Sequence, residues 1–263
     1  MAARHRGQFD PSNPNPYELS RSRVESFIQC PACFYLIQVK GVKYPSIPGF
    51  NINEATDVLL KRDFDKYRGK DTTHPFLINQ GLSHLVPFQH EDFEKWTQSL
   101  HFGAAGRMHY VHGETNLKVG GGLDDVWLNT KTNKLHIVDY KSTSQKTEGR
   151  EITLDDPWKE SYKRQMDLYV WIMRKMGFDV DSLGYFLYCD GDRFSEYDFL
   201  GEDDASMRFV MSLIPYETSS VWIEPTLKDI SDCLLQTDMP NHNEGCEFGG
   251  LFNQMGEKFS DSR

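Results

Sequence analysis

Three side chains near the middle of the chain, Asp124, Asp139 and Lys141, are of the types that metal-assisted phosphodiester hydrolysis needs. Two carboxylates about 5 Å apart on a face directed to the core repel each other and lose hydration, unless a cation binds between them. Oxygen ligands favour Mg²⁺ or Mn²⁺ over Zn²⁺. An amine beside the cation can orient the attacking water and stabilise developing negative charge. The set therefore predicts a divalent-cation site with a catalytic lysine.

A β-hairpin would bring these side chains to one face. We expect residues 117–128 to form one strand and residues 134–142 the next. A turn centred between them places Asp124 opposite Asp139, and directly opposed residues point to the same side. Asp125 has the other parity, so we expect it on the opposite face. A slip of one residue would exchange the faces, and the apolar pattern favours the register that pairs the two aspartates.

An Asp-x-Lys sequence alone has a simpler interpretation, because a strand end often carries a solvated acid and a weak surface ion pair. Three features favour the functional interpretation instead. Asp139 lies inside an apolar run, a second aspartate stands at the symmetric hairpin position, and three glycines, 120–122, precede that aspartate. Glycines in a strand permit a close approach of the backbone to another group.

Residues 159–176 carry the clearest helical pattern, with apolar side chains at spacings of three and four. Gln165 and Tyr169 are four residues apart and share the apolar face. A buried glutamine needs a partner. It is therefore either a boundary residue or, with Tyr169, a group that reaches the cation site or a phosphate. Three basic residues on this helix are expected to extend a basic rim: Lys159, Lys163 and Arg164.

The remaining pattern mixes helices and strands, which predicts an α/β protein with a central mixed sheet flanked by helices. Helices are expected around 20–36, with a break at Cys30–Pro31, from 53 onward, within 91–100 and over 224–235; strands are expected at 183–189, 194–199 and 209–216. We expect a flexible N-terminal tail (1–18), one domain (19–255) and a C-terminal tail (256–263).

Composition limits the function. The 263 residues carry a net charge of −10, which argues against a protein that coats nucleic acid by bulk electrostatics but permits an enzyme with a local site. No apolar run reaches the roughly 18 residues of a membrane span, so we expect no membrane partner. Five cysteines are an odd number for a disulfide framework and indicate reducing conditions, hence a cytoplasmic location.

Four stretches together resemble the RecB-like branch of the PD-(D/E)XK nuclease superfamily. They are S-x-S…CP-x-x-F at residues 20–34, G-L-D at 122–124, V-D-Y-K at 138–141 and Q-x-x-x-Y at 165–169. Their order and spacing cover about residues 20–250, and the combination is far more specific than any single piece.

The resemblance implies a restriction-endonuclease-like core and a Mg²⁺- or Mn²⁺-dependent DNA nuclease. Asp124, Asp139 and the Tyr140 backbone carbonyl would bind the metal, Lys141 would be the catalytic lysine, and Gln165 with Tyr169 would support the site or contact DNA. The activity would be exonuclease-like, in DNA repair, recombination or defence, with DNA and a helicase-like or other partner of such pathways. The family's G-x-x-x-H helix matches residues 53–57, so Asp57 would stand at the His position, with Glu54 as the alternative.

Some relatives in this branch hold an iron–sulfur cluster between an N-terminal cysteine and a C-terminal cysteine group. Cys30, Cys33 and Cys246 are the candidates in this chain, but a C-terminal C-x-x-C would need a cysteine where Gly249 stands. Four thiolates are the usual set. The other interpretation, that Cys30 and Cys33 are small buried apolar residues, is the favoured one.

Two further functions remain open at this point. A catalytically silent module of the same fold could bind nucleic acid or a partner protein, as the acidic net charge and the missing His allow. A structural scaffold within a repair or defence complex is the third interpretation.

Overall fold

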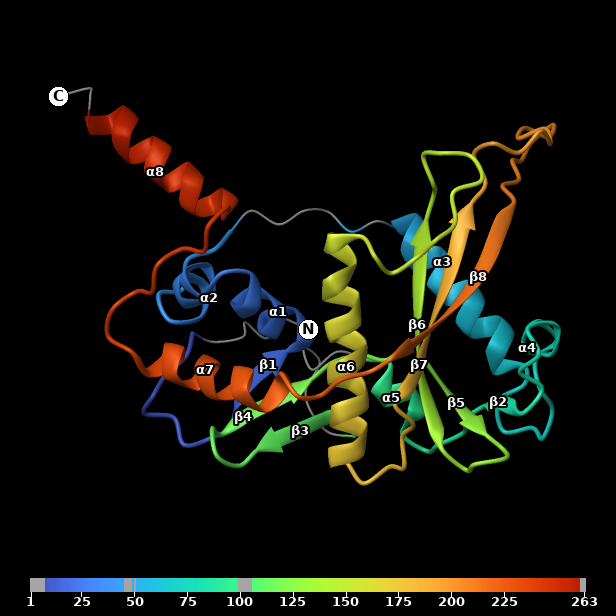
Figure 1. The fold of residues 1–263 in the computed structure, drawn as a ribbon, viewed down its shortest axis with the longest axis horizontal. Coiled ribbons are helices and arrows are strands. Elements are labelled where there is room, and N and C mark those ends of the chain that lie inside the picture. The colour runs from blue at the N-terminus through green and yellow to red at the C-terminus, as the bar shows by residue number, and fades with distance from the viewer. Residues whose placement is uncertain (1–7, 45–48, 50, 99–105, 261–263) are drawn as a thin grey trace.

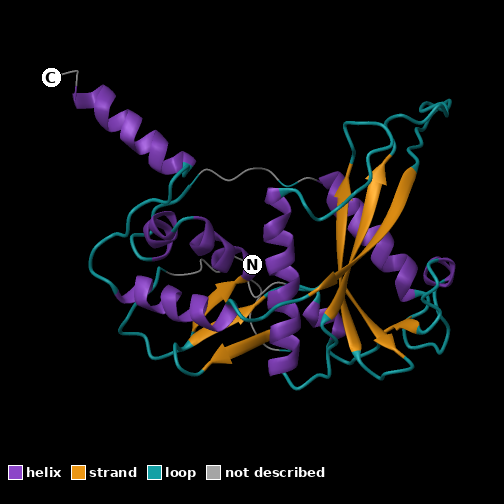
Figure 2. Ribbon diagram, viewed as in Figure 1, coloured by secondary structure: helices purple, strands orange, loops and turns teal. Residues whose placement is uncertain are grey.

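The computed structural model describes residues 8–44, 49, 51–98 and 106–260. The chain is an α/β protein, as predicted, and its strands form two separate sheets, drawn in orange in Figure 2. The larger sheet is mixed and has the order β2-β5-β6-β7-β8, in which only β6 and β7 are parallel. Its strands are β2 (Leu85–Pro87), β5 (Asp125–Asn129), β6 (Leu135–Thr143), β7 (Leu183–Gly191) and β8 (Phe209–Glu217).

The smaller sheet has the order β1-β4-β3, formed by β1 (Tyr17–Ser20), β4 (Leu117–Gly120) and β3 (His109–His112). The helices are α1 (Arg21–Gln29), α2 (Pro31–Gln38), α3 (Asn51–Asp65), α4 (Pro75–Asn79), α5 (Phe93–Trp96), α6 (Glu160–Lys175), α7 (Ile223–Leu235) and α8 (Glu247–Ser260). A single 3₁₀ turn, Pro157–Lys159, leads into α6.

Helix α6 stands between the two sheets, and α3 lies along the other side of the larger sheet (Figure 1). The main hydrophobic core joins both sheets through α6, since it contains Val119 of β4, Ile137 of β6 and Met166 of α6. A second core lies on the α3 side and contains Phe64, Trp127 and other residues of the larger sheet. The two faces of β5 and β6 therefore belong to different cores.

The predicted hairpin register is confirmed for β5 and β6. Val126 pairs with Ile137, and Leu128 pairs with Leu135. The first strand is shorter than predicted, because the chain leaves the smaller sheet after β4 and joins the larger one only at β5. Between β4 and β5, two glycines lie in close contact with neighbouring groups. A Cβ on Gly121 would lie 2.5 Å from the Tyr169 ring, and one on Gly122 would lie 2.9 Å from the Thr97 carbonyl oxygen.

Local signals set most element boundaries. Pro31 separates α1 from α2 as predicted, because proline is tolerated at the first turn of a helix but not in its interior. Helix α6 keeps the predicted apolar spacing and ends before Gly177, whose φ of 97° lies in the left-handed region that favours glycine.

Other predictions differ from the structure. The partner of β7 is β8, not residues 194–199, which lie in the connecting loop, because β8 pairs along the whole of β7. The helix expected within 91–100 is the short α5, and residues 99–100 lie outside the described part. Of the expected tails, 1–7 and 261–263 are not described, whereas residue 17 begins β1 and α8 continues past 256.

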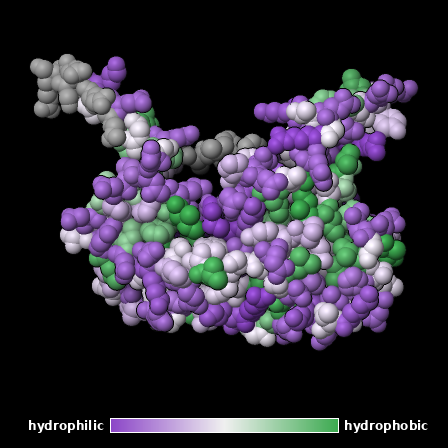
Figure 3. All heavy atoms as spheres, in the orientation of Figure 1, coloured by the Kyte–Doolittle hydropathy of each residue, from purple (hydrophilic) through white to green (hydrophobic). Residues whose placement is uncertain are grey.

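The visible surface carries hydrophilic residues over its whole extent, as expected for a chain with 26% charged residues (Figure 3). Among the described helices, none combines the length and apolarity that a bilayer span requires.

Candidate active site

The C-terminal half of β6 carries the predicted acid and amine on its α6-facing side. Asp139 is only 1% exposed, and its Oδ2 forms an ion pair with Nζ of Lys141. The same Nζ lies 4.7 Å from the centre of the Tyr162 ring and 3.4 Å from the Tyr140 carbonyl oxygen. Two residues apart on one strand, the acid and the amine share a face because side chains alternate along a strand.

Asp124 reaches this pair by a route that differs from the prediction. The β5–β6 ladder ends at Asp125, which pairs with Val138, and Asp124 lies in the bend just before it. Its Oδ2 accepts a hydrogen bond of 2.8 Å from the Tyr140 amide, in the peptide group that joins Asp139 to Tyr140. A backbone hydrogen bond, rather than a cross-strand pair, thus brings the second carboxylate to the first.

The carboxylates are electrostatically crowded. Burial raises the pKa of Asp124 to about 8, and the negative charge of Asp139 adds to this shift, while Lys141 and the Tyr140 amide oppose it. For Lys141, burial lowers the pKa, but attraction from Asp139 and Asp124 outweighs burial and raises the pKa above its ordinary value. The amine is therefore charged at neutral pH. Its single positive charge does not balance two ionised carboxylates, so the site has excess negative charge when both acids are ionised.

Gln165 is not a boundary residue. Its Nε2 donates a hydrogen bond of 2.7 Å to Oδ1 of Asp139 and lies 3.4 Å from the Tyr169 hydroxyl. Its Oε1 accepts a hydrogen bond of 2.7 Å from the guanidinium of Arg21, at the start of α1. The prediction had no role for Arg21, and the only local signal is its place inside the S-x-S motif. The hydrogen bonds that link Arg21, Gln165 and Asp139 fix the orientation of the Asp139 carboxylate.

Asp57 lies on α3, whose beginning is joined to the end of β6 by contact between the Thr56 and Ser142 hydroxyls. Burial raises the pKa of Asp57 to about 6, with Lys141 opposing the shift and Asp139 adding to it. The pKa of Asp57 therefore depends on the charges of Lys141 and Asp139. Glu54 is exposed.

The opposite face of the same strands carries a second polar group, in which every acid oxygen has a donor. Asp125, fully buried, accepts 2.7 Å hydrogen bonds from the Arg68 guanidinium and the Tyr140 hydroxyl, and one of 3.2 Å from the Trp127 indole. The parity argument placed Asp125 on this face, and the structure confirms it. Tyr140 contributes to both groups, its backbone to the first and its hydroxyl to the second.

The expected basic rim on α6 is different in the structure. Lys159 is buried and pairs with Asp156, Lys163 pairs with Glu160, and Arg164 holds Glu25 through two hydrogen bonds of 2.9 and 2.7 Å. These cations are neutralised by neighbouring acids, so they add little free positive charge beside the site.

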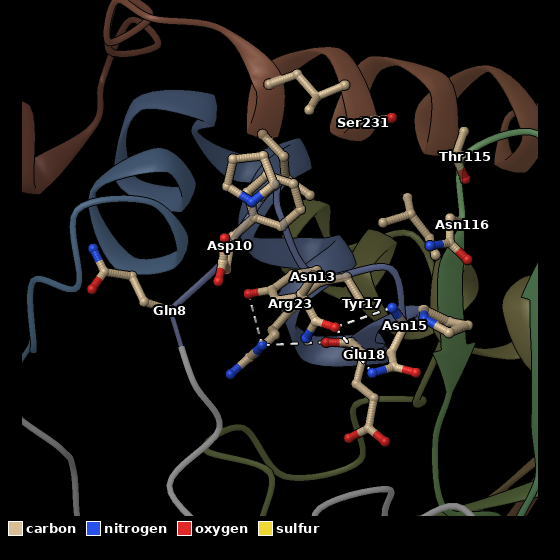
Figure 4. Close-up of a pocket in the computed structure, with 16 residues that line it drawn as sticks. Gln8, Asp10, Asn13, Asn15, Tyr17, Glu18, Arg23, Thr115, Asn116 and Ser231 are labelled. Atoms are coloured by element: carbon tan, nitrogen blue, oxygen red, sulfur yellow. Dashed lines mark hydrogen bonds between the residues drawn. The ribbon is translucent and has the colours of Figure 1, made fainter.

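Two other regions are distinct from this site. The three predicted cysteines, Cys30, Cys33 and Cys246, do come together, and His242 joins them, so that the four side chains form a set that can bind a metal. A cavity beside α7 with a mixed polar and apolar lining, which includes Tyr17, Arg23, Asn116 and Leu234, contains none of the residues of the carboxylate site (Figure 4).

The carboxylate site offers oxygen atoms that could hold a divalent cation. Oδ2 of Asp139 is buried, and its polar contact among the described residues is the ion pair with Lys141. Asp124 and the Tyr140 carbonyl are further oxygen donors beside it. Hard oxygen donors of this kind suit Mg²⁺ or Mn²⁺.

No protein-family model matches this chain, and no curated protein matches it significantly. The resemblance to PD-(D/E)XK nucleases therefore stays a prediction from the sequence motifs.

Proposed function

We propose that this chain is a metal-dependent DNA nuclease of the RecB-like PD-(D/E)XK type, which hydrolyses phosphodiester bonds. The observation that carries the proposal is the convergence of Asp124, Asp139 and Lys141 on the α6 side of β6, with Gln165 holding the buried acid. An α/β fold with a mixed sheet between helices agrees with this type of enzyme.

Asp124, Asp139 and the Tyr140 carbonyl would hold Mg²⁺ or Mn²⁺, and Asp57 is the additional acid on α3 that senses the same charges. When bound, the cation would lower the pKa of a water molecule and neutralise charge on the scissile phosphate. The raised pKa of Asp124 supports this assignment, since a cation would offset both the burial and the repulsion from Asp139 that otherwise keep Asp124 protonated.

Lys141 supplies a positive charge that does not depend on pH near neutrality. A protonated amine donates hydrogen bonds, so Lys141 can orient the attacking water and stabilise negative charge on the phosphate oxygens as the bond breaks. Its ring contact with Tyr162 and its place at the strand end limit where the ammonium can lie. We therefore assign Lys141 as the catalytic lysine.

Gln165, Tyr169 and Arg21 act as positioning residues. Gln165 hydrogen-bonds to Asp139 directly. Arg21 and Tyr169 contact Gln165 and so position Asp139 through it. A carboxylate that must bind a cation in one orientation benefits from such support, because partners behind the ligands orient them and tune their basicity.

Cleavage of end-labelled DNA by the full chain tests the proposal. Single-stranded and double-stranded oligonucleotides are incubated with Mg²⁺, with Mn²⁺, with Ca²⁺ or with no added divalent cation. We expect cleavage with Mg²⁺ or Mn²⁺ only, and the product ladder will show whether hydrolysis begins at an end, as an exonuclease-like activity requires. Cleavage without added cation, or none with any cation, would reject the proposal. The second result would favour the catalytically silent module.

A further inference from the structure

The second group of ligand side chains joins the two ends of the described chain. Cys30 and Cys33 flank the start of α2, whereas His242 and Cys246 lie more than two hundred positions later, just before α8. One ligand atom from each residue lies within 4.8 Å of every other. Helix α8 projects from the body directly after this group (Figure 1).

The contacts are too many for hydrogen bonding to explain. Nδ1 of His242 lies 3.4 Å from Sγ of Cys30, 3.6 Å from Sγ of Cys33 and 3.5 Å from Sγ of Cys246. An imidazole nitrogen carries either one proton or one lone pair, so it can form one well-directed hydrogen bond at a time and not three. Three sulfurs around one nitrogen are explained by an ion at their centre.

The spacing also identifies the kind of centre. In a tetrahedral zinc site, bonds of about 2.3 Å to sulfur and 2.0–2.1 Å to nitrogen place neighbouring ligand atoms about 3.5–3.8 Å apart. The Sγ atoms of Cys33 and Cys246 are 3.5 Å apart, and the sulfur–nitrogen distances are similar. In an iron–sulfur cluster the ligands are divided among at least two irons, so the four ligand atoms cannot all bind one ion.

We propose that Cys30, Cys33, His242 and Cys246 bind a single Zn²⁺ ion in a closed Cys₃His site. This replaces the iron–sulfur cluster that the family resemblance raised for the same cysteines. The sequence pattern missed His242 because a C-terminal C-x-x-C was sought downstream of Cys246, whereas the fourth ligand lies four residues upstream.

Gly249 supports the assignment of His242. A cysteine at this position would have completed the C-x-x-C pattern, but a Cβ there would lie 2.7 Å from Cγ and 2.8 Å from Cβ of His242. A side chain at 249 and the imidazole therefore cannot both be accommodated without a shift. The Gly249 amide instead donates a hydrogen bond of 3.4 Å to Sγ of Cys246, as expected for a thiolate that is held in place.

The site is structural, because four protein ligands leave no open position for a substrate. It would hold the segment before α8 against α1 and α2, together with a hydrogen bond of 2.8 Å from Asn243 to the Gln29 carbonyl and one of 3.0 Å from the Tyr35 hydroxyl to the Thr237 carbonyl. At the start of α8, Phe248 stacks on Tyr44 at 4.3 Å. This inference does not depend on the proposed nuclease activity.

Metal analysis of the full chain tests the proposal. The protein is produced with both zinc and iron supplied and is purified anaerobically without chelator. We expect about one zinc per chain, little iron and no acid-labile sulfide. Iron together with inorganic sulfide would overturn the proposal in favour of a cluster, and protein that contains no bound metal would overturn it as well.

Cobalt substitution and two variants identify the ligands. Cobalt bound to the zinc-free protein should give the visible bands of a tetrahedral ion and a thiolate charge-transfer band. His242→Ala should lose zinc during dialysis that the wild type resists, and His242→Cys should retain zinc and show a stronger thiolate band. Cys189→Ala, a buried cysteine in β7 outside the group, is the matched control and should retain zinc. Full zinc retention in His242→Ala would overturn the fourth ligand.

Discussion

The two faces of β6 carry two buried polar groups of opposite character. On the α3 side, Asp125 receives donors from Arg68, Tyr140 and Trp127, and its oxygens are satisfied within the fold. On the α6 side, Asp124 and Asp139 lie near one ammonium, and burial together with the charge of Asp139 raises the pKa of Asp124 to about 8. In the first group each carboxylate oxygen accepts a hydrogen bond, whereas in the second Oδ2 of Asp139 has the ion pair with Lys141 but no hydrogen bond among the described residues.

Under the proposed function, this difference separates structural from functional use of the same residue types. A buried carboxylate with a full set of partners lowers the cost of its burial and fixes the surrounding packing. A group that is left with excess negative charge is destabilising by itself and is tolerated where a ligand relieves it. The neighbouring aspartates 124 and 125 thus have different surroundings, because Asp125 begins β5 and faces the α3 side, whereas Asp124 lies in the bend before β5 and reaches the α6 side.

The largest expected effect is on catalysis. Asp139→Asn removes a charged cation ligand while keeping the shape of the side chain, so DNA cleavage should fall at least about a hundredfold. Initial cleavage rates at saturating Mg²⁺ measure this. Asp198→Asn, an exposed aspartate in the β7–β8 loop, is the matched control. Equal rates for the two variants would contradict the assignment of Asp139.

The opposite face should respond in stability instead. Asp125→Ala leaves the Arg68 guanidinium buried without its main partner, and loss of one member of a buried ion pair costs about 3–5 kcal/mol. Denaturant unfolding measures this change in the free energy of unfolding. Asp124→Asn should not destabilise the protein in the same measurement, and a comparable loss in both variants would remove the distinction between the two faces.

A smaller effect is expected when the support behind Asp139 is removed. Gln165→Ala abolishes the hydrogen bond to Oδ1 of Asp139 and the link to Arg21, so Mn²⁺ affinity or activity should fall by about 10–100-fold. A merely structural role would lower thermal stability without changing Mn²⁺ affinity. Calorimetric titration with Mn²⁺ separates these outcomes, and Gln254→Ala on the exposed surface of α8 is the control.

A further effect is a pH dependence of stability without divalent cations. Burial, with the charge of Asp139, raises the folded-state pKa of Asp124 to about 8, whereas an unfolded aspartate titrates near about 4. Between these values the folded state binds more protons, so stability falls as pH rises toward about 8. Asp57, with its pKa raised to about 6 mainly by burial, adds to the lower part of this range.

Unfolding of the wild type and of Asp124→Asn across this pH range, in buffer without Mg²⁺, tests the sign. The variant should gain stability relative to the wild type as pH increases, because its amide does not ionise. Parallel curves would show that the pKa of Asp124 is not raised in the folded protein.

Local patterns predicted the parts of this arrangement that depend on short sequence distances. Alternation along one strand placed Asp139 with Lys141 and set Asp125 apart, and helical spacing placed Gln165 beside Tyr169. The prediction of one continuous strand through Asp124 was wrong. The path between β4 and β5 involves tertiary contacts, such as the close approach of Gly121 to the Tyr169 ring, which a local pattern does not encode.

The rest depends on long-range contacts that no local period encodes. Arg21 reaches Gln165 from 144 positions away, and His242 reaches Cys30 from 212 positions away. Histidine and arginine are common surface residues, so only the folded arrangement reveals which of them complete a site.

The most direct test of the central claim is Mn²⁺ binding followed by electron paramagnetic resonance. We predict that the wild type binds Mn²⁺, and that the Asp124→Asn/Asp139→Asn double variant loses this binding while it keeps its fold and its zinc. Equal Mn²⁺ binding by both proteins, or no binding by the wild type, would contradict the account.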